Sequence, residues 1–126
     1  MHTSGVVHRN LQPLNLLVDT SSETLKVKIT GFGLAAKLEE GQTITRASSN
    51  FGFMPPEIVG NYPSDFKVDI WSLGVILFSL ISSSTPFSGK DSAQTAHNII
   101  NEPLSFEKPV WNSVSADCKN IIIGML

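Results

Sequence analysis

The stretch Asp69-Ile-Trp-Ser-Leu-Gly-Val-Ile-Leu-Phe-Ser-Leu-Ile81 decides the fold of this 126-residue chain. Only Ser72, Gly74 and Ser79 interrupt the apolar residues that follow Asp69, so a helix here would leave no face for water. A helix that is apolar all round is either buried in a domain or spans a membrane, and a span needs about 20 apolar residues. We therefore expect a core helix over residues 69–81, entered through Asp69 and packed on every side.

The composition bounds the class of protein. The chain is 41% hydrophobic and 16% charged, which is typical of one globular domain. Nine basic and eleven acidic residues give a net charge of -2, and this balance argues against a nucleic-acid or membrane surface. Cys118 is the single cysteine, so an intrachain disulfide and a thiol cluster for zinc are excluded. No signal peptide is evident, and we expect an intracellular, cytoplasmic protein.

The segments before the core helix predict a small amount of strand. Leu25, Val27 and Ile29 alternate with polar residues, which is the pattern of a half-buried strand, and residues 15–30 therefore predict a β-hairpin. Residues 34–50 are polar without a clean period and predict a loop. Pro55-Pro-Glu-Ile-Val59 then predicts a short helix, because proline is tolerated in a first turn.

Two further helices are predicted after the core helix. Asp91 and Ser115 each stand where a capping residue would begin one. The apolar positions expected to face inward are Ala93, Ala96, Ile99 and Ile100 in the first, and Cys118, Ile121, Ile122 and Met125 in the second. The first five residues lack a cap and the last helix reaches Leu126 uncapped, so we expect both ends to lie inside a larger domain.

One motif matches the letters of a dinucleotide fingerprint. Gly31-Phe-Gly-Leu-Ala-Ala36 follows a predicted strand and matches G-x-G-x-x-A, in which glycines let the backbone approach a pyrophosphate at a helix N-terminus. The polar run after it predicts hardly any helix, and no acidic residue stands roughly 20 positions further on. A chance match is the favoured interpretation.

A second set of motifs resembles the protein kinases. His8-Arg-Asn-Leu-Gln-Pro-Leu-Asn15 resembles the catalytic loop HRDLKPEN, Gly31-Phe-Gly33 falls at the position of DFG, and Met54-Pro-Pro-Glu57 at that of APE. Asp69-Ile-Trp-Ser-Leu-Gly74 resembles the central-helix motif, and Thr85-Pro-Phe87 and the tail from Trp111 resemble the calcium/calmodulin-dependent group of serine/threonine kinases. The resemblance implies a mainly α fold over residues 1–126 with a small β-hairpin. This would be a partial C-terminal lobe without the N-terminal lobe and the final helix.

The resemblance also implies which chemical groups are changed. Asn10 stands at the position of the catalytic base and Gln12 at that of the lysine that meets the γ-phosphate. Gly31 stands at the position of the main magnesium ligand, and Asn15 alone of the metal pair is retained. The family uses ATP and magnesium. We expect neither cofactor here, because one amide oxygen is a poor magnesium site.

The retained residues have packing roles in the family. His8, Phe32 and Asp69 are expected to meet, with the Asp69 carboxylate accepting from the loop backbone while capping its own helix, and Trp71 is expected in the core. Arg9 would pair with a phosphorylated activation-loop residue, for which the candidates are Thr43, Thr45, Ser48 and Ser49, although a solvated arginine is favoured. Glu57 lacks its family partner and is expected to be exposed or differently paired.

Four hypotheses follow. The preferred one is a catalytically inactive pseudokinase fragment that binds a protein partner or itself through its exposed lobe surface. The alternatives are a serine/threonine kinase portion that is active with ATP and magnesium when an N-terminal lobe completes it, a dinucleotide binder, and a truncated product without function.

Overall fold

A helix through the middle of the molecule organises the computed structural model, which describes residues 1–45 and 50–126. This helix, α2, spans Lys67–Ser82 and so extends the predicted core helix at both ends. It ends where Ser83 adopts a left-handed conformation with φ of 56°. In the part of the chain that is described, no helix is long and apolar enough to cross a membrane.

The core forms where three groups of side chains meet α2. Near its start Val68 packs in a cluster with Val7 and Ile58. In its middle Trp71, Val75 and Ile76 pack in a cluster with Leu11, Phe53, Phe87 and Ile99. Near its end Phe78 packs with Trp111 and Ile122. The successive turns of one apolar helix thus hold the start, the middle and the end of the chain together.

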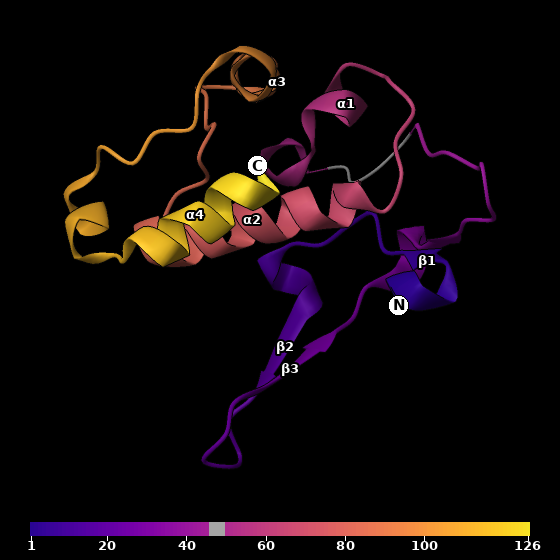
Figure 1. Cartoon of the computed structure of the whole chain (residues 1–126), viewed down its shortest axis with the longest axis horizontal. Helices are drawn as coiled ribbons and strands as arrows, with labels where there is room; N and C mark the ends of the chain where they lie inside the picture. The colour runs from indigo at the N-terminus through magenta and orange to yellow at the C-terminus, as the bar shows by residue number, and fades with distance from the viewer. Residues whose placement is uncertain (46–49) are drawn as a thin grey trace.

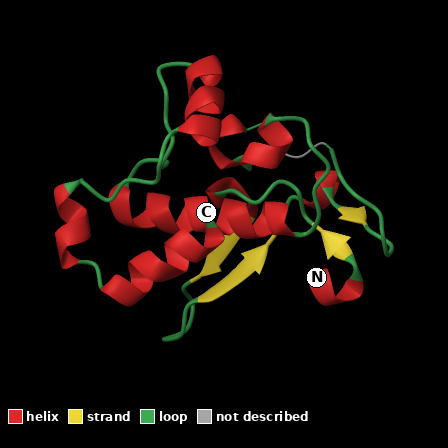
Figure 2. Cartoon of the chain, turned by 45° about the horizontal axis from the view of Figure 1, so that its top comes forward, coloured by secondary structure: helices red, strands yellow, loops and turns green. Residues whose placement is uncertain are grey.

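The prediction that α2 is packed on every side is wrong. Leu80 is 72% exposed and Ile70 is 37% exposed. The elements that cover α2 do not surround it: α4 spans Ala116–Met125 and lies beside it, as Figures 1 and 2 show. An apolar residue on the uncovered side therefore remains in contact with solvent.

Close approach of α2 and α4 depends on a glycine. A Cβ atom at Gly74 would lie 2.8 Å from Cβ of Met125 and 2.9 Å from Cδ2 of Leu126. The predicted cap is confirmed, because Ser115 Oγ accepts a hydrogen bond from the Cys118 amide at 3.2 Å. The predicted inward face of α4 is only partly right, since Ile122 is buried and Ile121 is 53% exposed.

The helices α1 and α3 lie against each other on one side of α2 (Figure 1). The predicted short helix is confirmed as α1, Pro56–Val59. The predicted cap of α3, Ser92–Asn101, is confirmed as well, because Asp91 Oδ1 accepts from the Gln94 amide at 2.7 Å. On α3 the inward positions are Ala96 and Ile99, whereas Ala93 and Ile100 are exposed, so the predicted face was too wide. The 3-10 helices are η1 His2–Ser4, η2 Pro13–Asn15, η3 Phe32–Leu34, η4 Phe51–Phe53 and η5 Pro109–Ser113.

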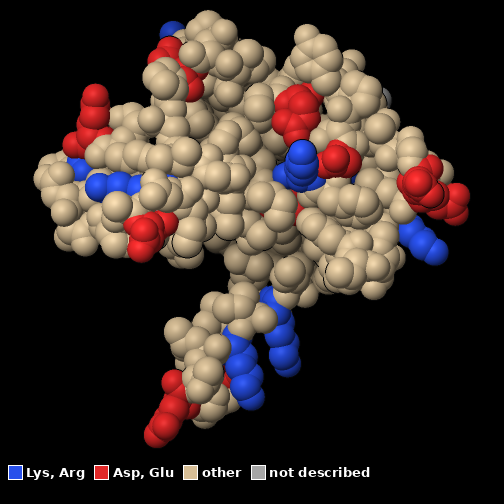
Figure 3. All heavy atoms as spheres, in the orientation of Figure 1, with Lys and Arg blue, Asp and Glu red and all other residues tan. Residues whose placement is uncertain are grey.

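The predicted β-hairpin is confirmed and projects away from the helices (Figures 1 and 3). Its strands are β2, Leu16–Asp19, and β3, Lys26–Ile29, which pair antiparallel with Leu16 opposite Ile29. The prediction that β3 is half-buried is wrong, because all four of its residues are exposed. The alternation does place apolar residues on one face, but only Leu16, at the base of that face, packs against the core.

A second sheet was not predicted. The strands β1, Val6–Val7, and β4, Ala36–Lys37, pair antiparallel, so part of the segment 34–50 that was predicted as loop is a strand. Further along, Ile44 and Ser64 form an isolated bridge with hydrogen bonds in both directions, of 2.9 and 2.8 Å. Each of these strands has only two residues, which is too short to show a period in the sequence. Their pairing also depends on residues that are distant in the chain.

Candidate functional site

The loop of residues 8–15 is held on α2 by the carboxylate of Asp69. Its Oδ2 accepts from the His8 amide at 2.8 Å, and its Oδ1 accepts from the Arg9 amide at 2.8 Å. His2 Nε2 also donates to Oδ2 at 2.7 Å. Since Asp69 is 1% exposed, these contacts satisfy a buried charge and fix the loop backbone. Arg9 adopts a left-handed conformation there, with φ of 66°.

The prediction that Asp69 also caps its own helix is wrong. The N-cap of α2 is Phe66, and Asp69 lies inside the first turn. An exposed carboxylate serves the helix start instead, because Asp65 Oδ1 accepts from the Lys67 amide at 2.8 Å. The Asp69 side chain is thus directed entirely towards the loop of residues 8–15 and His2.

The expected meeting of His8, Phe32 and Asp69 is confirmed. The ring of His8 is fully buried and meets Phe32 edge-on, with ring centroids 4.9 Å apart. His8 Nε2 donates to the Thr30 carbonyl at 2.8 Å, while Nδ1 accepts from the Asn10 amide at 3.2 Å. Both ring nitrogens of His8 are therefore hydrogen-bonded to backbone groups. Phe32, in contrast, is 50% exposed.

Neutral amide side chains meet one another on the outer side of this loop. Gln12 Nε2 donates to Asn10 Oδ1 at 3.0 Å, and Asn50 Nδ2 donates to Gln12 Oε1 at 2.9 Å. Asn50 caps η4, since its Oδ1 accepts from the Gly52 amide at 3.2 Å. The amides of Asn10 and Gln12 therefore link the loop to the segment at residues 50–53.

Asn15 and Gly31 come together at the base of the hairpin. Asn15 Nδ2 donates to the Asn10 carbonyl at 2.8 Å, and the Thr30 amide donates to the Asn15 carbonyl at 2.9 Å. Gly31 adopts a left-handed conformation with φ of 79°. A Cβ atom built on Gly31 would lie 2.3 Å from Asn15 Oδ1. The Asn15 amide thus occupies the space in which a side chain at position 31 would begin.

The structure places Arg9 beside the segment that follows Gly31. Arg9 Nε donates to the Leu34 carbonyl, so the expectation of a merely solvated arginine is wrong. Thr43 and Thr45 are exposed on either side of the bridge residue Ile44. The other candidates for a phosphorylated residue, Ser48 and Ser49, lie outside the described residues. A pairing of Arg9 with a modified residue stays a prediction.

The remaining predicted residues have structural partners. The expectation for Glu57 is confirmed, because this half-buried carboxylate accepts from Ser64 Oγ at 3.0 Å. Trp71 is a core aromatic, as predicted, and stacks on Phe87 with ring centroids 5.7 Å apart.

The residues present do not fit a magnesium ion. A magnesium site requires carboxylate or phosphate oxygens and room for water ligands. In the described residues no group of three or more His, Cys, Asp or Glu side chains could hold a metal. The amide oxygens of Asn10 and Gln12 already accept hydrogen bonds, and the one amide oxygen of Asn15 is by itself a poor magnesium ligand set.

The structure agrees with the favoured interpretation of Gly31–Ala36 as a chance match and contradicts the alternative of a dinucleotide site. After Gly31 the chain forms the single turn η3, Phe32–Leu34, and then enters strand β4. A pyrophosphate site of the predicted kind needs the N-terminus of a continuing helix. The segment therefore supplies the glycines of the motif without its helix.

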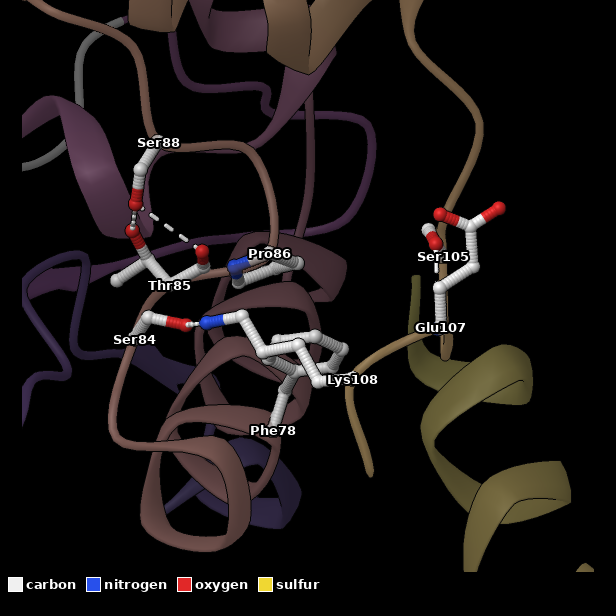
Figure 4. Close-up of a pocket in the computed structure, with 8 residues that line it drawn as sticks. All are labelled: Phe78, Ser84, Thr85, Pro86, Ser88, Ser105, Glu107 and Lys108. Carbon is white, nitrogen blue, oxygen red and sulfur yellow. Dashed lines mark hydrogen bonds between the residues drawn. The ribbon is translucent and has the colours of Figure 1, made fainter. Parts of the chain in front are cut away.

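The hollow drawn in Figure 4 lies elsewhere, between the end of α2 and residues 105–108. It has a volume of about 360 Å³ and lies over the buried ring of Phe78. Lys108 reaches across it to the Ser84 hydroxyl, while Glu107 lies on the opposite wall. Its lining includes no residue of the loop at 8–15 or of Gly31-Phe-Gly33.

Two contacts of the site could not have been predicted from motifs. His2 reaches Asp69 across 67 positions of sequence, and its ring packs on Phe66 with centroids 5.2 Å apart. Asn50 reaches Gln12 across 38 positions. Each is one polar residue in a polar stretch, so no local period or spacing distinguishes it.

Comparison with known proteins identifies the family of the chain. The model of the protein kinase domain family matches residues 1–126. A calcium/calmodulin-dependent protein kinase type 1 of Macrobrachium nipponense is 35% identical over 122 residues, covering 97% of this chain and 35% of the relative. The serine/threonine-protein kinase PEPKR2 of Arabidopsis thaliana is 35% identical over 125 residues, covering 99% of this chain and 26% of the relative. A calcium/calmodulin-dependent protein kinase type 1 of Caenorhabditis elegans is 35% identical over 126 residues, covering the whole chain and 36% of the relative.

The chain therefore belongs to the protein kinase family. It spans about a third of the length of these curated relatives, or less.

Proposed function

We propose that this chain is part of the C-terminal lobe of a protein kinase domain, that it does not transfer phosphate, and that it acts by binding protein. The observation that carries the proposal is the set of neutral amides at Asn10, Gln12 and Asn15, which bond to one another and to the backbone. They leave no carboxylate where the family needs a base.

The chemical reason is that phosphoryl transfer depends on positioning and electrostatics. A carboxylate accepts the proton of the substrate hydroxyl, and metal ions neutralise the phosphates. The amide of Asn10 cannot accept that proton at neutral pH, and loss of a general base alone costs a factor of about 10²–10⁴ in rate. Gln12 supplies no positive charge for a phosphate, and Gly31 has no side-chain oxygen.

Phosphate transfer tests this part of the proposal directly. The purified chain is incubated with γ-labelled ATP, magnesium and a mixture of protein substrates, beside a full-length relative as the positive control. We expect no label on any substrate, or on the chain itself, above a preparation without the chain. Label that rises with the amount of chain and is lost on heat treatment would overturn it.

The hairpin supplies the surface for protein binding. Residues directly opposite in an antiparallel pair share a face, so the register puts Val18, Val27, Leu16 and Ile29 on one face. The other face carries Asp19, Lys26 and Lys28 as well as Leu17. Val18 and Val27 are 56% and 60% exposed, and a lone two-stranded sheet is only marginally stable in water. We therefore propose that the uncharged face pairs with the same face of a second copy.

Sedimentation velocity over a range of concentrations tests the self-association. Val27→Lys places a charge on the apolar face, and Lys28→Gln is the matched control, because it changes the opposite face of the same strand. We expect the unchanged chain and Lys28→Gln to associate, and Val27→Lys to remain monomeric. A monomer at every concentration for all three proteins would show that the face has another partner or none.

A second candidate function is that of a kinase portion completed by a separate N-terminal lobe, which would use ATP and magnesium. The retained contacts of Asp69 with the loop backbone favour it, because the scaffold of the loop is intact. To test this candidate, a variant of the chain that carries Asn10→Asp and Gly31→Asp is mixed with the N-terminal lobe of a relative, ATP and magnesium. This candidate requires phosphate transfer in that mixture, and we expect none. An intracellular location stays a prediction.

A further inference from the structure

Each strand of the projecting hairpin has an outer edge along which another strand could pair. The Thr30 amide donates to the Asn15 carbonyl at 2.9 Å, so these residues form a hydrogen-bonded pair at the base of the hairpin. Hydrogen-bonded and non-hydrogen-bonded pairs alternate along an antiparallel ladder. Val18 and Val27, which lie opposite each other, are therefore a non-hydrogen-bonded pair, and the N–H and C=O groups of both point away from the hairpin.

The edge of β3 is unsuited to pairing with itself because of its lysines. Val27 lies between Lys26 and Lys28, so two copies paired antiparallel about Val27 would place each lysine opposite a lysine of the other copy. Like charges directly opposite each other are destabilising. Lysines along an edge strand are also a means by which proteins avoid edge-to-edge pairing.

The edge of β2 is suited to pairing with itself. Two copies paired antiparallel about Val18 would place Leu17 opposite Asp19 of the second copy, so no like charges meet. Each Val18 would donate to and accept from Val18 of the second copy, in the pattern of a hydrogen-bonded pair. Val18 is 56% exposed, so the strand is accessible at this point.

Pairing of β2 with β3 of a second copy would bring opposite charges together, but the size of the molecule opposes it. In that arrangement neighbouring hairpins point in the same direction and stand about 10 Å apart. A folded body of about 100 residues has a radius of gyration of about 13 Å, so the helices of adjacent copies would overlap. Pairing of β2 with β2 instead points the two hairpins in opposite directions. Because each hairpin projects away from its helices (Figure 1), the helices of the two copies then lie at opposite ends.

We propose that the hairpins of two copies join through their β2 edges, about Val18, into a four-stranded antiparallel sheet. The inference rests on the proposed self-association and deepens it. Residues directly opposite each other share a face of a sheet, so the apolar faces of the two hairpins become one face. Exposed backbone hydrogen bonds only replace bonds to water and contribute little by themselves. The sheet therefore depends on stacking of its apolar face on that of another such sheet, which gives an assembly of four copies.

Proline substitutions separate the two edges. Val18→Pro and Val27→Pro each remove one outward N–H, at directly opposite positions of the same apolar face. Proline is tolerated on an edge strand where its nitrogen faces solvent, so both variants should keep the hairpin. In sedimentation velocity we expect the unchanged chain and Val27→Pro to reach four copies, and Val18→Pro to stop at two. The same species for both proline variants, or an unchanged chain that stops at the dimer, would overturn the edge pairing.

Disulfide cross-linking tests the register without proline. In a chain that carries Cys118→Ala, which removes the native thiol, Val18→Cys puts a thiol at the centre of the proposed pairing. The Cα atoms of a hydrogen-bonded pair are about 5.5 Å apart, which a disulfide can span, whereas stacked sheets lie about 10 Å apart, which it cannot. We expect mild oxidation to link Val18→Cys chains into covalent dimers and to leave Val27→Cys chains unlinked. Equal linking of the two variants, or none of Val18→Cys, would overturn the register.

The edge pairing and the proposed function fail through different measurements. A chain that forms only a dimer and gives no cross-link contradicts the edge pairing, and it leaves the proposed contact of the apolar faces standing. A chain that is monomeric at every concentration contradicts both contacts. The proposed lack of phosphate transfer is measured separately and depends on neither result.

Discussion

At the scale of single residues, Asp69 holds the loop of residues 8–15 on α2. It is a fully buried charge that receives three hydrogen bonds, from His2, His8 and Arg9. Burying a charge is costly unless it is paired and hydrogen-bonded. Burial of the Asp69 carboxylate therefore requires the folded loop, and the loop in turn depends on its hydrogen bonds to this residue of α2.

We predict that Asp69→Asn destabilises the chain by about 3 kcal/mol, because hydrogen bonds to charged groups are worth about 1.5–3 kcal/mol each and the amide places an N–H against backbone donors. Urea unfolding followed by circular dichroism measures the change. Asp117→Asn is the control, since Asp117 is exposed in the first turn of α4. An equal effect of both substitutions would contradict the role given to Asp69.

A second residue-scale prediction concerns the turn of the hairpin. The Ser21 side chain and then the Ser21 backbone amide lower the pKa of Asp19 from its ordinary value. The lowered pKa means that this contact stabilises the turn above the ordinary pKa of an aspartate and is lost as the pH falls through the lowered one.

We expect Ser21→Ala to raise the pKa of Asp19 part of the way back, because the amide donor, 2.9 Å from Asp19 Oδ1, remains. A titration of the carboxyl signal by nuclear magnetic resonance measures this shift. Thr20→Ala, which removes a neighbouring hydroxyl of the same turn, is the control. An unchanged pKa in Ser21→Ala would show that the hydroxyl has no such effect.

At the scale of elements, the contact between α2 and α4 is decided by the absence of a side chain at Gly74. Alanine is favoured over glycine in a helix by about 1 kcal/mol, yet a Cβ here would lie 2.8 Å from Cβ of Met125. Overpacking of a well-packed interface costs about 1–3 kcal/mol. The crowding therefore offsets or exceeds the gain in helix propensity.

Gly124 offers the matched comparison, because it lies in α4 and a Cβ there would meet nothing within 4 Å. We predict that Gly124→Ala stabilises the chain by up to about 1 kcal/mol, and that Gly74→Ala leaves it about 2 kcal/mol less stable than Gly124→Ala. Thermal unfolding of the two variants measures the difference. Equal stabilisation by both would show that the helices can separate at no cost.

At the scale of the whole molecule, stability is distributed unevenly. The helices share buried clusters along α2, whereas β3 is exposed at every residue. Segments with few buried apolar contacts open with a lower free energy than the core. The projecting hairpin is therefore the weakest folded part of the monomer.

We predict that amide hydrogens of Val18 and Val27 exchange with solvent at least tenfold faster than those of Val75 and Ile76 in α2. Hydrogen exchange of the dilute monomer measures this ratio. At concentrations where the chain associates, the difference should shrink, because the proposed contact covers the hairpin. Equal exchange rates for the hairpin and α2 amides in the dilute monomer would contradict the conclusion that the hairpin is the weakest folded part.

Sequence by itself determined the apolar middle helix, the hairpin at residues 15–30, the caps at Asp91 and Ser115, and the substitutions at Asn10, Gln12 and Gly31. These features depend on a local period, on a residue next to its own helix, or on letters in a motif, so neighbours in the chain are enough to reveal them. The contact of His8 with Phe32 and Asp69 could be predicted because each of these residues stands at a defined position of a family motif.

Only the tertiary structure decided which surfaces were covered. The alternation in β3 correctly separated apolar from charged residues, but burial of a face also requires packed neighbours, and all four residues of β3 are exposed. In the same way, the pairing of β1 with β4, the reach of His2 to Asp69 and the packing of Asn15 on Gly31 depend on where distant segments meet. Periodicity determines which side of an element is apolar, whereas burial and closure of a site depend on what else occupies the space.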